Sequence, residues 1–522
     1  MDKQIKKLID WQKTALKNAE FSFVEKIIVD FPTAEIYLVG GAVRDILLGR
    51  TTKDFDFVIT GVAAEKLEKF FSGLGEVNLV GKSFGVFKFV PAGFSVGSPA
   101  PLSALADTST RAGAEIFEAI DIALPRTEQA GMSGGYKDFA VQSDPSLPIE
   151  DDLSRRDFTI NALAWSIKDE KIIDEFGGLD DLEQGIIKAI GEPAQRFQED
   201  YTRMLRAIRF ACQLDFTIEK KTYGEIKNKA KEIATIASER INEEFTKIIM
   251  SDRAEAGIRL MQEIGLLKEL IPELAASSGV SQNRHHIYDV YEHSVRALGA
   301  GAERGYKLEV RLAALLHDIG KPQTKEGEGV ESTFYNHDIV GAKIAKKILK
   351  RLNYSNEVID YAVHLVRYHM FYYALDIVSD SGVRRLLSRI GKDNIDDFIA
   401  VRICDRLGMG RPKAKPWKLV ELERRFKEVQ LDPITPKIIK LKGDELMKLL
   451  DLAPGPRVGL ILNALLGEVL DDPGRNDHDY LVKKAQELDK LPADDLKQLN
   501  PDTKFYEEER KRNLHRQKND ED

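Results

Sequence analysis

Cysteine is scarce in this sequence, and long apolar runs are absent from it. Cys212 and Cys404 are the only cysteines, and they lie far apart in the chain. This excludes a secreted scaffold stapled by disulfides and a zinc module built on thiolates. Nowhere do about 18 apolar residues follow one another, and the amphipathic N-terminal segment has no apolar core of signal-peptide length. We therefore expect a soluble, cytoplasmic protein that does not contact a membrane.

An excess of positive charge is also lacking. The 522 residues include 77 basic and 85 acidic side chains, which gives a formal charge of −8. Such a chain has no global field that draws it to nucleic acid or to an anionic membrane, so any polyanion must be met by local patches. At roughly 150 residues per domain, the length predicts about three or four domains.

Strand-like segments gather in the first part of the chain. Short β-branched or aromatic runs, separated by glycine-rich turns and helical patterns, occur at 36–39, 55–59, 86–90, 116–124 and 189–191. From about residue 192 the pattern has a helical period and shows no convincing strand. The predicted fold class is therefore α+β, with an α/β head that carries a mixed sheet, followed by an all-helical body.

Composition suggests where the chain divides. RPKAKPWK at 411–418 is typical of a linker, and the composition of 91–113 is typical of an irregular insertion. The charged C-terminal segment is typical of a disordered tail. The predicted domains are an N-terminal helix (1–30), the head (31–190), a helical neck (191–275), a histidine-rich helical domain (276–410), a helical tail (411–500) and the charged end (501–522).

Two carboxylates stand close to a glycine turn in the stretch LVGGAVRDILLGRTTKDFDFVI. On a strand, residues i and i+2 share a face, so Asp54 and Asp56 point the same way, roughly 6.5 to 7 Å apart at the backbone. Like charges so placed are best tolerated when a hard divalent cation such as Mg²⁺ lies between them. Gly40 and Gly41 precede a helix N-terminus, where a phosphate can approach the backbone. A nucleoside triphosphate on the turn, bridged by Mg²⁺ to both carboxylates, would satisfy both features.

Each of these motifs alone more often has a structural role. A GG turn often only accommodates a positive φ, and a DxD often ends a strand in solvent, but their close succession favours function. A third carboxylate would complete the site and help to deprotonate an attacking hydroxyl. We predict Asp121 for this role. Glu118 is the rival, but its strand parity is opposite, so only one of the two faces the metal.

Six motifs, in order along the chain, resemble those of one family. They are GGAVRD with LLG and DFDF, DIALPRTE, RRDFTINALA at 155–164, DEFGGLDDL at 174–182, EDYTRMLRAIRFA at 199–211 and SERINEEFTKI at 238–248. They are similar to class II tRNA nucleotidyltransferases and bacterial poly(A) polymerases, within the DNA polymerase β superfamily. The resemblance implies a polymerase-β-like head that transfers nucleotides from CTP and ATP to an RNA 3′ end. This transfer is metal-dependent, uses no nucleic-acid template and releases pyrophosphate.

The resemblance also implies roles for single residues. Asp54 and Asp56 match the metal-binding and catalytic pair, and Asp121 matches the third carboxylate, which is often Glu in the family. Arginine is a bidentate partner for phosphate, and asparagine can meet a ribose hydroxyl. The residues assigned to nucleotide binding are Gly40, Gly41, Arg44, Arg156, Asp157, Asn161, Asp200, Arg203, Arg206 and Arg209.

Asp200 and Arg203 match a motif that hydrogen-bonds the incoming base in the family. We expect both on one helix, where residues i and i+3 share a face and present an acceptor and a donor fork to cytosine or adenine. An ordinary surface ion pair is the alternative. Arg203, Arg206 and Arg209 are expected to continue as a basic stripe for RNA phosphates, although a solvated helix face would look the same.

Histidine is concentrated in one stretch, since seven of the nine histidines fall between His285 and His369. The series that resembles an HD-domain metallophosphohydrolase is His293, His317, Asp318, His337, His369 and Asp405. Such ligands on separate helices suit Mn²⁺, Ni²⁺, Mg²⁺ or Fe, and leave open positions for a water that attacks phosphate. The set predicts a second activity on a phosphomonoester or 2′,3′-cyclic phosphate at RNA ends. His285, His286 and His364 have no predicted role.

The predicted function is completion or repair of the 3′-terminal CCA of tRNA, with tRNA, CTP and ATP as partners. A poly(A) polymerase, or an enzyme that adds only CC or only A, is the nearest alternative, because one base-selecting motif serves all of them. A second alternative is an HD-domain phosphohydrolase of RNA ends with an inactive head, and a third is a silent RNA-binding protein. The oligomeric state is left open.

Overall fold

The computed structural model describes residues 2–52, 54–79, 85–94, 119–129, 140–283, 287–370, 378–432 and 438–500. The chain folds into two compact units, residues 1–276 with 350–354 and residues 277–349 with 355–522. The finer domain boundaries remain predictions. The tail at 501–522, and the predicted insertion at 91–113 from residue 95 onward, lie outside the described residues.

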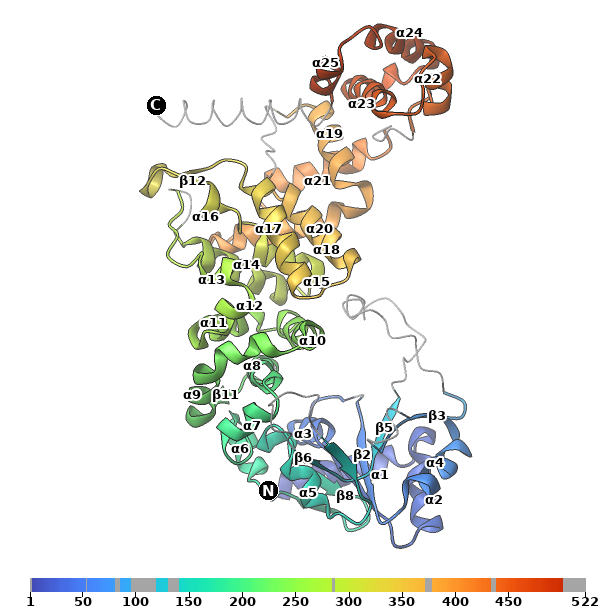
Figure 1. Ribbon diagram of the computed structural model, residues 1–522, viewed down its shortest axis with the longest axis vertical. Coiled ribbons are helices and arrows are strands. Elements are labelled where there is room, and N and C mark those ends of the chain that lie inside the picture. Colours follow the sequence, from blue (N-terminus) through green and yellow to red (C-terminus); the bar gives the residue numbers. More distant parts are fainter. Residues whose placement is uncertain are drawn as a thin grey trace. The chain divides into compact units, whose positions relative to one another are not determined.

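A mixed sheet forms the centre of the first unit, which confirms the predicted fold class. Within the described residues its strands lie in the order β3-β4-β5-β2-β1-β8-β9. Strands β2 and β5 are parallel, and the other neighbours are antiparallel. The bounds are β1 Glu35–Val39, β2 Asp56–Thr60, β3 Gly75–Leu79, β4 Val86–Pro91, β5 Ile120–Ala123, β8 Ala164–Ser166 and β9 Lys171–Ile173. Figure 1 shows β2, β5 and β8 gathered in the blue-to-teal part of the chain.

The strand predictions were wrong at several places. Segment 189–191 is no strand, because Ala189 forms only an isolated bridge to Phe158. Strand β8 was missed because it is buried throughout and so lacks the alternation that marks a half-buried strand. Short ladders also occur outside the main sheet, two of them with strands beyond residue 192. The small pairs are β6 Arg126–Gln129 with β7 Ala140–Ser143, β10 Ile186–Ile187 with β11 Thr217–Ile218, and β12 Lys325–Glu326 with β13 Thr333–Phe334.

Helices surround the sheet and continue beyond it in the first unit. Glycines bound α3: Gly40 precedes its first residue, and Gly49 closes it in the left-handed conformation that favours glycine. The bounds are α1 Asp2–Ala15, α2 Ser22–Asp30, α3 Gly41–Leu48, α4 Ala64–Ser72, α5 Ile149–Ser154, α6 Gly178–Gln184, α7 Pro193–Glu199, α8 Thr202–Leu214, α9 Lys220–Lys229, α10 Ser238–Ile249, α11 Ala254–Ile264, α12 Leu266–Leu270 and α13 Pro272–Ala275.

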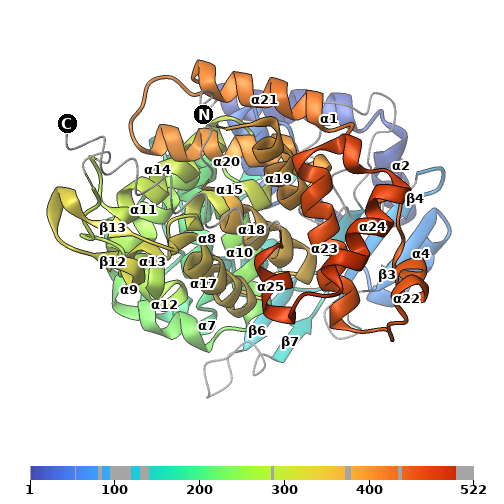
Figure 2. The same ribbon diagram turned by 90° about the horizontal axis from the view of Figure 1, so that it is seen from above.

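The second unit is built of helices. Side chains of Asp289, Ser355 and Ser379 cap the N-termini of α14, α18 and α19 by accepting backbone N–H groups. Helix α14 lies beside α15 and α20 (Figure 2). The bounds are α14 Val290–Glu303, α15 Leu308–Leu316, α16 Lys321–Thr324, α17 His337–Arg351, α18 Asn356–Tyr368, α19 Asp380–Ile390, α20 Ile395–Gly408, α21 Trp417–Val429, α22 Gly443–Leu450, α23 Pro456–Asp471, α24 His478–Leu488 and α25 Ala493–Gln498. In the described part of the chain, no helix combines the length and apolarity needed to span a bilayer.

Candidate active site and metal centre

The segment that carries Asp54 and Asp56 has two chemically different faces. The rings of Phe55 and Phe57 both pack against Phe21, with ring centroids 5.0 and 6.1 Å away. Because side chains alternate along an extended segment, the two carboxylates lie on the opposite face from these rings. Asp56 is the first residue of β2, and Asp54 precedes the strand.

Asp121 lies directly beside Asp56, on the neighbouring strand β5. On the other side of β5, Lys88 of β4 pairs in register with Asp121. Its Nζ is 3.5 Å from Oδ1 of Asp121. Glu118 lies outside the described residues. The structure thus brings the predicted carboxylates together and adds Lys88, which no motif in the sequence indicated.

Burial and neighbouring negative charge raise the pKa values of Asp56 and Asp121. Burial raises the pKa of Asp56 to about 6, and the charge of Asp54 adds to this effect. The charges of Arg156 and Lys88 act in the opposite sense. Burial also raises the pKa of Asp121, while Lys88 lowers it. A cation would stabilise the ionised forms, and Mg²⁺ prefers oxygen ligands, so this set of side chains fits a divalent metal.

The glycine turn beside these carboxylates has no room for a side chain. Gly40 has a φ of +69°, and a Cβ there would lie 2.5 Å from Nη1 of Arg156. Helix α3 begins at Gly41, so its first N–H groups lie at the turn. In the described part of the chain, nothing accepts a hydrogen bond from Nε of Arg156. The turn therefore combines close backbone approach with a guanidinium group, which is the environment that a phosphate needs.

Asp152 was missed in the sequence, and it holds Arg156 in place. Its side chain is fully buried, and its Oδ2 accepts a hydrogen bond from Nη2 of Arg156 at 3.2 Å. Its Oδ1 accepts from Nη2 of Arg155 at 2.6 Å. Burial alone would raise the pKa of Asp152, but the charges of Arg156 and Arg155 hold it below its usual value. The available signal was its spacing, because Asp152 precedes Arg156 by one helical turn.

Four of the predicted nucleotide ligands form one chain of hydrogen bonds. Nη1 of Arg44 donates to Oδ1 of Asn161 at 2.7 Å, and Nδ2 of Asn161 donates to Oδ1 of Asp157 at 2.9 Å. Nε of Arg206 donates to Oδ2 of Asp157 at 2.7 Å. Burial alone would raise the pKa of Asp157, but Arg206 and the hydrogen bond from Asn161 lower it far below its usual value. The ionised Asp157 therefore connects the head to α8.

Asp200 and Arg203 do not share one helix, so that expectation was wrong. Asp200 ends α7 with an extended backbone, and Arg203 lies in the first turn of α8. Oδ2 of Asp200 accepts from Nη2 of Arg240 at 2.6 Å, whereas Nη1 of Arg203 donates to Oε2 of Glu199 at 2.6 Å. The bend between the helices gives the two side chains different partners. Their contact with a base remains a prediction.

The expected open basic stripe on α8 was also wrong. Arg203 and Arg209 are buried. Nε of Arg209 lies 3.2 Å from Oε2 of the buried Glu244, and Arg206 is 3.7 Å from the other oxygen of Glu244. Both guanidinium groups also lie over the ring of Phe210, at 4.3 Å for Arg209 and 5.6 Å for Arg206. The sequence could not pair Glu244 with α8, because the contact depends on how α10 packs.

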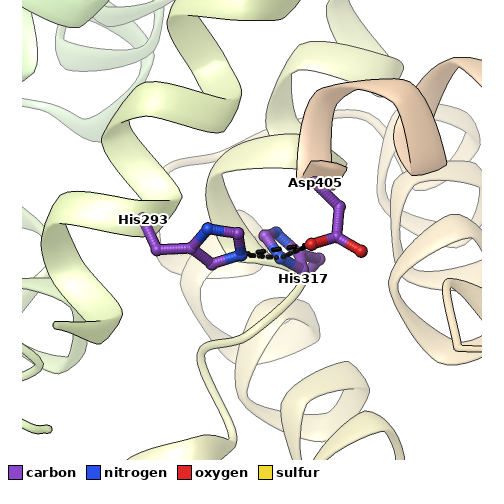
Figure 3. A group of neighbouring side chains, drawn as sticks. All are labelled: His293, His317 and Asp405. Carbon is purple, nitrogen blue, oxygen red and sulfur yellow. Dashed lines mark hydrogen bonds and ion pairs between the residues drawn. The ribbon is translucent and has the colours of Figure 1, made fainter. Parts of the chain in front are cut away.

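The second unit brings the predicted HD residues together from separate helices. Figure 3 shows His293 of α14, His317 at the end of α15, and Asp405 of α20 pointing toward one another. The Nε2 atoms of His293 and His317 are 2.9 Å apart. Oδ1 of Asp405 lies 3.3 Å from Nε2 of His293. These three residues form one group of metal-ligand geometry.

Asp318, His337 and His369 form a second such group. Oδ1 of Asp318 is 3.4 Å from Nε2 of His337 and 3.6 Å from Nε2 of His369. Its other oxygen, Oδ2, is 3.2 Å from Nε2 of both His293 and His317. The sequence prediction treated the six residues as one set, whereas the structure arranges them as two groups, with Asp318 facing both.

The tautomers of three histidines suit metal binding. His317, His337 and His369 each donate Nδ1–H to the carbonyl oxygen three residues earlier, at 2.8, 2.7 and 2.7 Å. Each Nε2 is therefore left with a lone pair directed into the site. Within the residues that the structure describes, Nε2 of His337 and of His369 find no hydrogen-bond partner. Buried acceptors of this kind, next to carboxylates, fit divalent metal ions.

The charges in this cluster suit a divalent cation. Burial lowers the pKa of His317, and it lowers the pKa of His337 to about 4, so both are neutral ligands. Burial acts in the same sense on His293, but hydrogen bonds to Asp318 and Asp405 outweigh it and raise its pKa to about 9. A proton on His293 thus offsets the two carboxylates, and a metal ion would take over that role.

Lys321 and Gln282 support the shared carboxylate, and nothing in the sequence indicated Gln282. The buried Nζ of Lys321 lies 2.7 Å from Oδ2 of Asp318 and donates to Oε1 of Gln282 at 2.5 Å. This pairing fixes how Asp318 is turned toward the two groups. His364 belongs to neither group, since its Nε2 bonds the carbonyl of Ile390. His285 and His286 lie outside the described residues.

Fold and sites together define a class of protein. A mixed sheet with crowded carboxylates beside a glycine turn is the arrangement of a nucleotidyltransferase head, and a helical unit with an HD cluster accompanies it. The protein-family model described as "Poly A polymerase head domain" matches residues 36–96 and 102–188, and the family model described as "HD domain" matches 290–409. A third, described as "Probable RNA and SrmB- binding site of polymerase A", matches 215–277.

Comparison with characterised proteins identifies the family. The A-adding tRNA nucleotidyltransferase of Deinococcus radiodurans is 33% identical over 382 residues, which cover 69% of this chain and 86% of the relative. The CC-adding tRNA nucleotidyltransferase of Thermus thermophilus is 30% identical over 456 residues, which cover 84% of this chain and 91% of the relative. A multifunctional CCA protein of Nitrosospira multiformis is 32% identical over 391 residues, which cover 73% of this chain and 85% of the relative. The chain belongs to the tRNA nucleotidyltransferase family and is an RNA nucleotidyltransferase, which confirms the resemblance noted in its motifs.

The solved structures agree on the fold. The CCA-adding enzyme of Bacillus stearothermophilus in complex with CTP has a TM-score of 0.61 and 23% identity, and the likeness covers 89% of this chain and 95% of that chain. The Thermotoga maritima CCA-adding enzyme complexed with tRNA has a TM-score of 0.50 and 22% identity.

Proposed function

We propose that this enzyme adds or repairs the 3′-terminal CCA of tRNA, using CTP and ATP and no nucleic-acid template. The observation that carries the proposal is the crowding of Asp54, Asp56 and Asp121 beside the Gly40 turn. The relatives named above act on tRNA and are named for adding A, CC or CCA. An RNA-binding family model also matches the segment that follows the head.

The residues of the head have separate tasks in this proposal. Mg²⁺, when held by Asp54 and Asp56, supplies positive charge that stabilises the transition state and the leaving pyrophosphate. The N–H groups after Gly40, together with Arg156, bind the triphosphate. Asp121 accepts the proton of the RNA 3′ hydroxyl as that oxygen attacks the α-phosphate.

The remaining ligands are proposed to hold the sugar and base. Hydrogen bonds and ion pairs, to one another or to neighbouring side chains, keep them in place before the nucleotide arrives, which lowers the entropy cost of binding it. These residues are Arg44, Asp157, Asn161, Asp200, Arg203, Arg206 and Arg209.

A tRNA that lacks its last three nucleotides tests the proposal. The purified chain is offered this RNA with Mg²⁺ and all four nucleoside triphosphates, and the extended ends are sequenced. We expect CCA. Addition of CC alone, of A alone after a supplied CC, or of a long A run would replace the proposal by the corresponding alternative. The double variant Asp54→Asn with Asp56→Asn should lose at least about 10³-fold in rate, because the charge that holds the metal is gone.

A second candidate activity rests on the HD cluster. Two groups that share Asp318, with two Nε2 atoms lacking partners in the described part of the chain, support binding of Mn²⁺, Ni²⁺, Mg²⁺ or Fe and hydrolysis of a phosphomonoester or 2′,3′-cyclic phosphate. Cleavage of 2′,3′-cyclic AMP and p-nitrophenyl phosphate by chain loaded with each metal in turn tests this activity. Absence of turnover with all four metals would assign the cluster a structural role.

A cytoplasmic location also belongs to the proposal. Cys212 and Cys404 are both buried free thiols, which suits a reducing compartment.

A further inference from the structure

The N-terminal helix α1 contacts the segment that carries Asp54 and Asp56. The indole of Trp11 stacks on the ring of Phe55, with centroids 5.8 Å apart and planes 25° apart. It also meets the edge of Phe21 at 6.1 Å. Phe55 is the residue between the two carboxylates, so Trp11 contacts the site segment from the face opposite the metal-binding side chains.

Helix α1 is anchored at three further points. Oε1 of the buried Gln12 accepts from Nε1 of Trp165 at 2.6 Å, and its Nε2 donates to the carbonyl of Ile167 at 3.0 Å. Nζ of Lys7 donates to the carbonyl of Leu47, in the last turn of α3, at 2.7 Å. Helix α1 therefore touches strand β8, the helix that follows the glycine turn, and Phe55. These hydrogen bonds fix the helix that carries Trp11, so the indole can support the ring of Phe55.

The sheet does not hold Asp54. The β2 ladder begins at Asp56, and Asp54 is exposed and precedes it. The backbone between them is tied to β5 at one point, where the carbonyl of Phe55 accepts from N of Asp121 at 3.2 Å. The position of Asp54 relative to Asp56 therefore depends on the ring of Phe55, which Trp11 and Phe21 both contact.

We propose that Trp11 is a positioning residue for nucleotidyl transfer, and that by stacking on Phe55 it sets the spacing of Asp54 and Asp56 for the metal. The inference rests on the proposed use of these two carboxylates as metal ligands. Because transfer depends on geometry, a small displacement of either carboxylate lowers kcat more than it changes nucleotide binding.

Hydrogen exchange without metal tests the structural part. In Trp11→Ala, amides of residues 54–60 should exchange about five- to tenfold faster than in the wild-type chain, because an aromatic stack is lost there. Trp11→Phe should restore most of the protection. The matched control is Phe31→Ala, which removes a different aromatic pair of the same unit, the edge-on contact with Phe70 at 5.6 Å.

Kinetics test the functional part. Trp11→Ala should need several-fold more Mg²⁺ for half-maximal incorporation and should show about tenfold lower kcat, with KM for CTP changed less than about twofold. Trp11→Phe should behave like wild type, and Phe31→Ala should lose thermal stability without the Mg²⁺ effect. Should Trp11→Ala fail to fold, Trp11→Leu keeps apolar bulk while removing the stacked plane and takes its place.

Two results would overturn the inference. One is unchanged exchange at 54–60 in the tryptophan variant, and the other is a Mg²⁺ requirement equal to that of Phe31→Ala. A different result would show that the proposed role of the carboxylates is wrong. In that case the Asp56→Asn variant would still incorporate nucleotides.

Discussion

Lys88 offsets part of the negative charge of the head site. It is in register with Asp121, and its ammonium lowers the pKa of both Asp121 and Asp56. With the pKa of Asp56 at about 6, the carboxylate is mostly ionised near neutral pH, which is the form that binds a cation. The site thus carries its own counter-charge before any metal arrives.

Replacing Lys88 by methionine should shift the pH dependence of nucleotide incorporation. Loss of the ammonium raises the pKa of both carboxylates, so the acid limb of the kcat/KM profile moves to higher pH. We expect incorporation about threefold below wild type at about pH 6.5, and near wild type above about pH 8. The exposed lysine of Lys66→Met, on α4, serves as control. An unchanged acid limb in the Lys88 variant would show that protonation of these carboxylates does not limit the rate.

Asp318 is the residue on which both groups of the HD cluster depend. Asp318→Asn should therefore remove metal from both groups, whereas His337→Ala should remove it from one. Metal content after loading with Mn²⁺ and exhaustive dialysis measures this by elemental analysis. We expect His337→Ala to hold about one ion fewer than wild type and Asp318→Asn fewer still. His364→Ala, outside both groups, should match wild type, and equal content in all variants would contradict the assignment.

At the scale of elements, the carboxylate of Asp157 ties α8 to the head. Asp157, which follows Arg156, accepts hydrogen bonds from Asn161 and from Arg206 of α8. Its pKa is lowered in the folded protein, so its contribution to stability is fully present above the pKa of an unfolded aspartate, near about 3.9. That contribution is lost as the pH falls below this value toward the lower folded pKa.

Asp157→Asn should accordingly cost stability at neutral pH and much less in acid. Hydrogen bonds to charged groups suggest a loss of about 2 kcal/mol at pH 7. The difference in Tm from wild type, measured by calorimetry on the full chain, should shrink between about pH 5 and pH 3. Asp180→Asn, an exposed change on α6, is the control. A difference that stays constant over this range would mean that the charge of Asp157 does not stabilise the fold.

At the scale of the whole molecule, each unit contains its own complete site. The carboxylates of the head lie in the first unit, and the HD residues lie in the second. Neither set takes a ligand from the other unit within the described residues. This arrangement predicts two chemistries that can be removed separately.

Variants of the two sites should therefore have opposite effects. Asp54→Asn with Asp56→Asn should abolish incorporation, by at least about 10³-fold, and leave metal-dependent phosphate release within about twofold of wild type. His317→Ala should have the converse effect. Both activities are measured on the same preparations, with wild type as reference. Equal loss of both activities in either variant would show that the sites are not independent.

The sequence by itself determined the class of the head and the residue types that the structure brings together in both sites. Alternation in DFDF places two aspartates on one face for reasons of backbone geometry alone, and the family motifs identified Asp121, Arg156, Asn161 and the HD series. These features are local, so the order of residue types is enough to show them. The α+β order of strands and helices is readable for the same reason.

Tertiary structure decided everything that depends on which distant segments meet. Asp200 and Arg203 are separated because the chain bends between α7 and α8, and Glu244 neutralises α8 only because α10 packs there. Asp318 faces two groups because five helices converge around it. Trp11 reaches Phe55 across many intervening residues. Such contacts are set by packing and by the burial of charge, which act between segments that the order of residues does not place side by side.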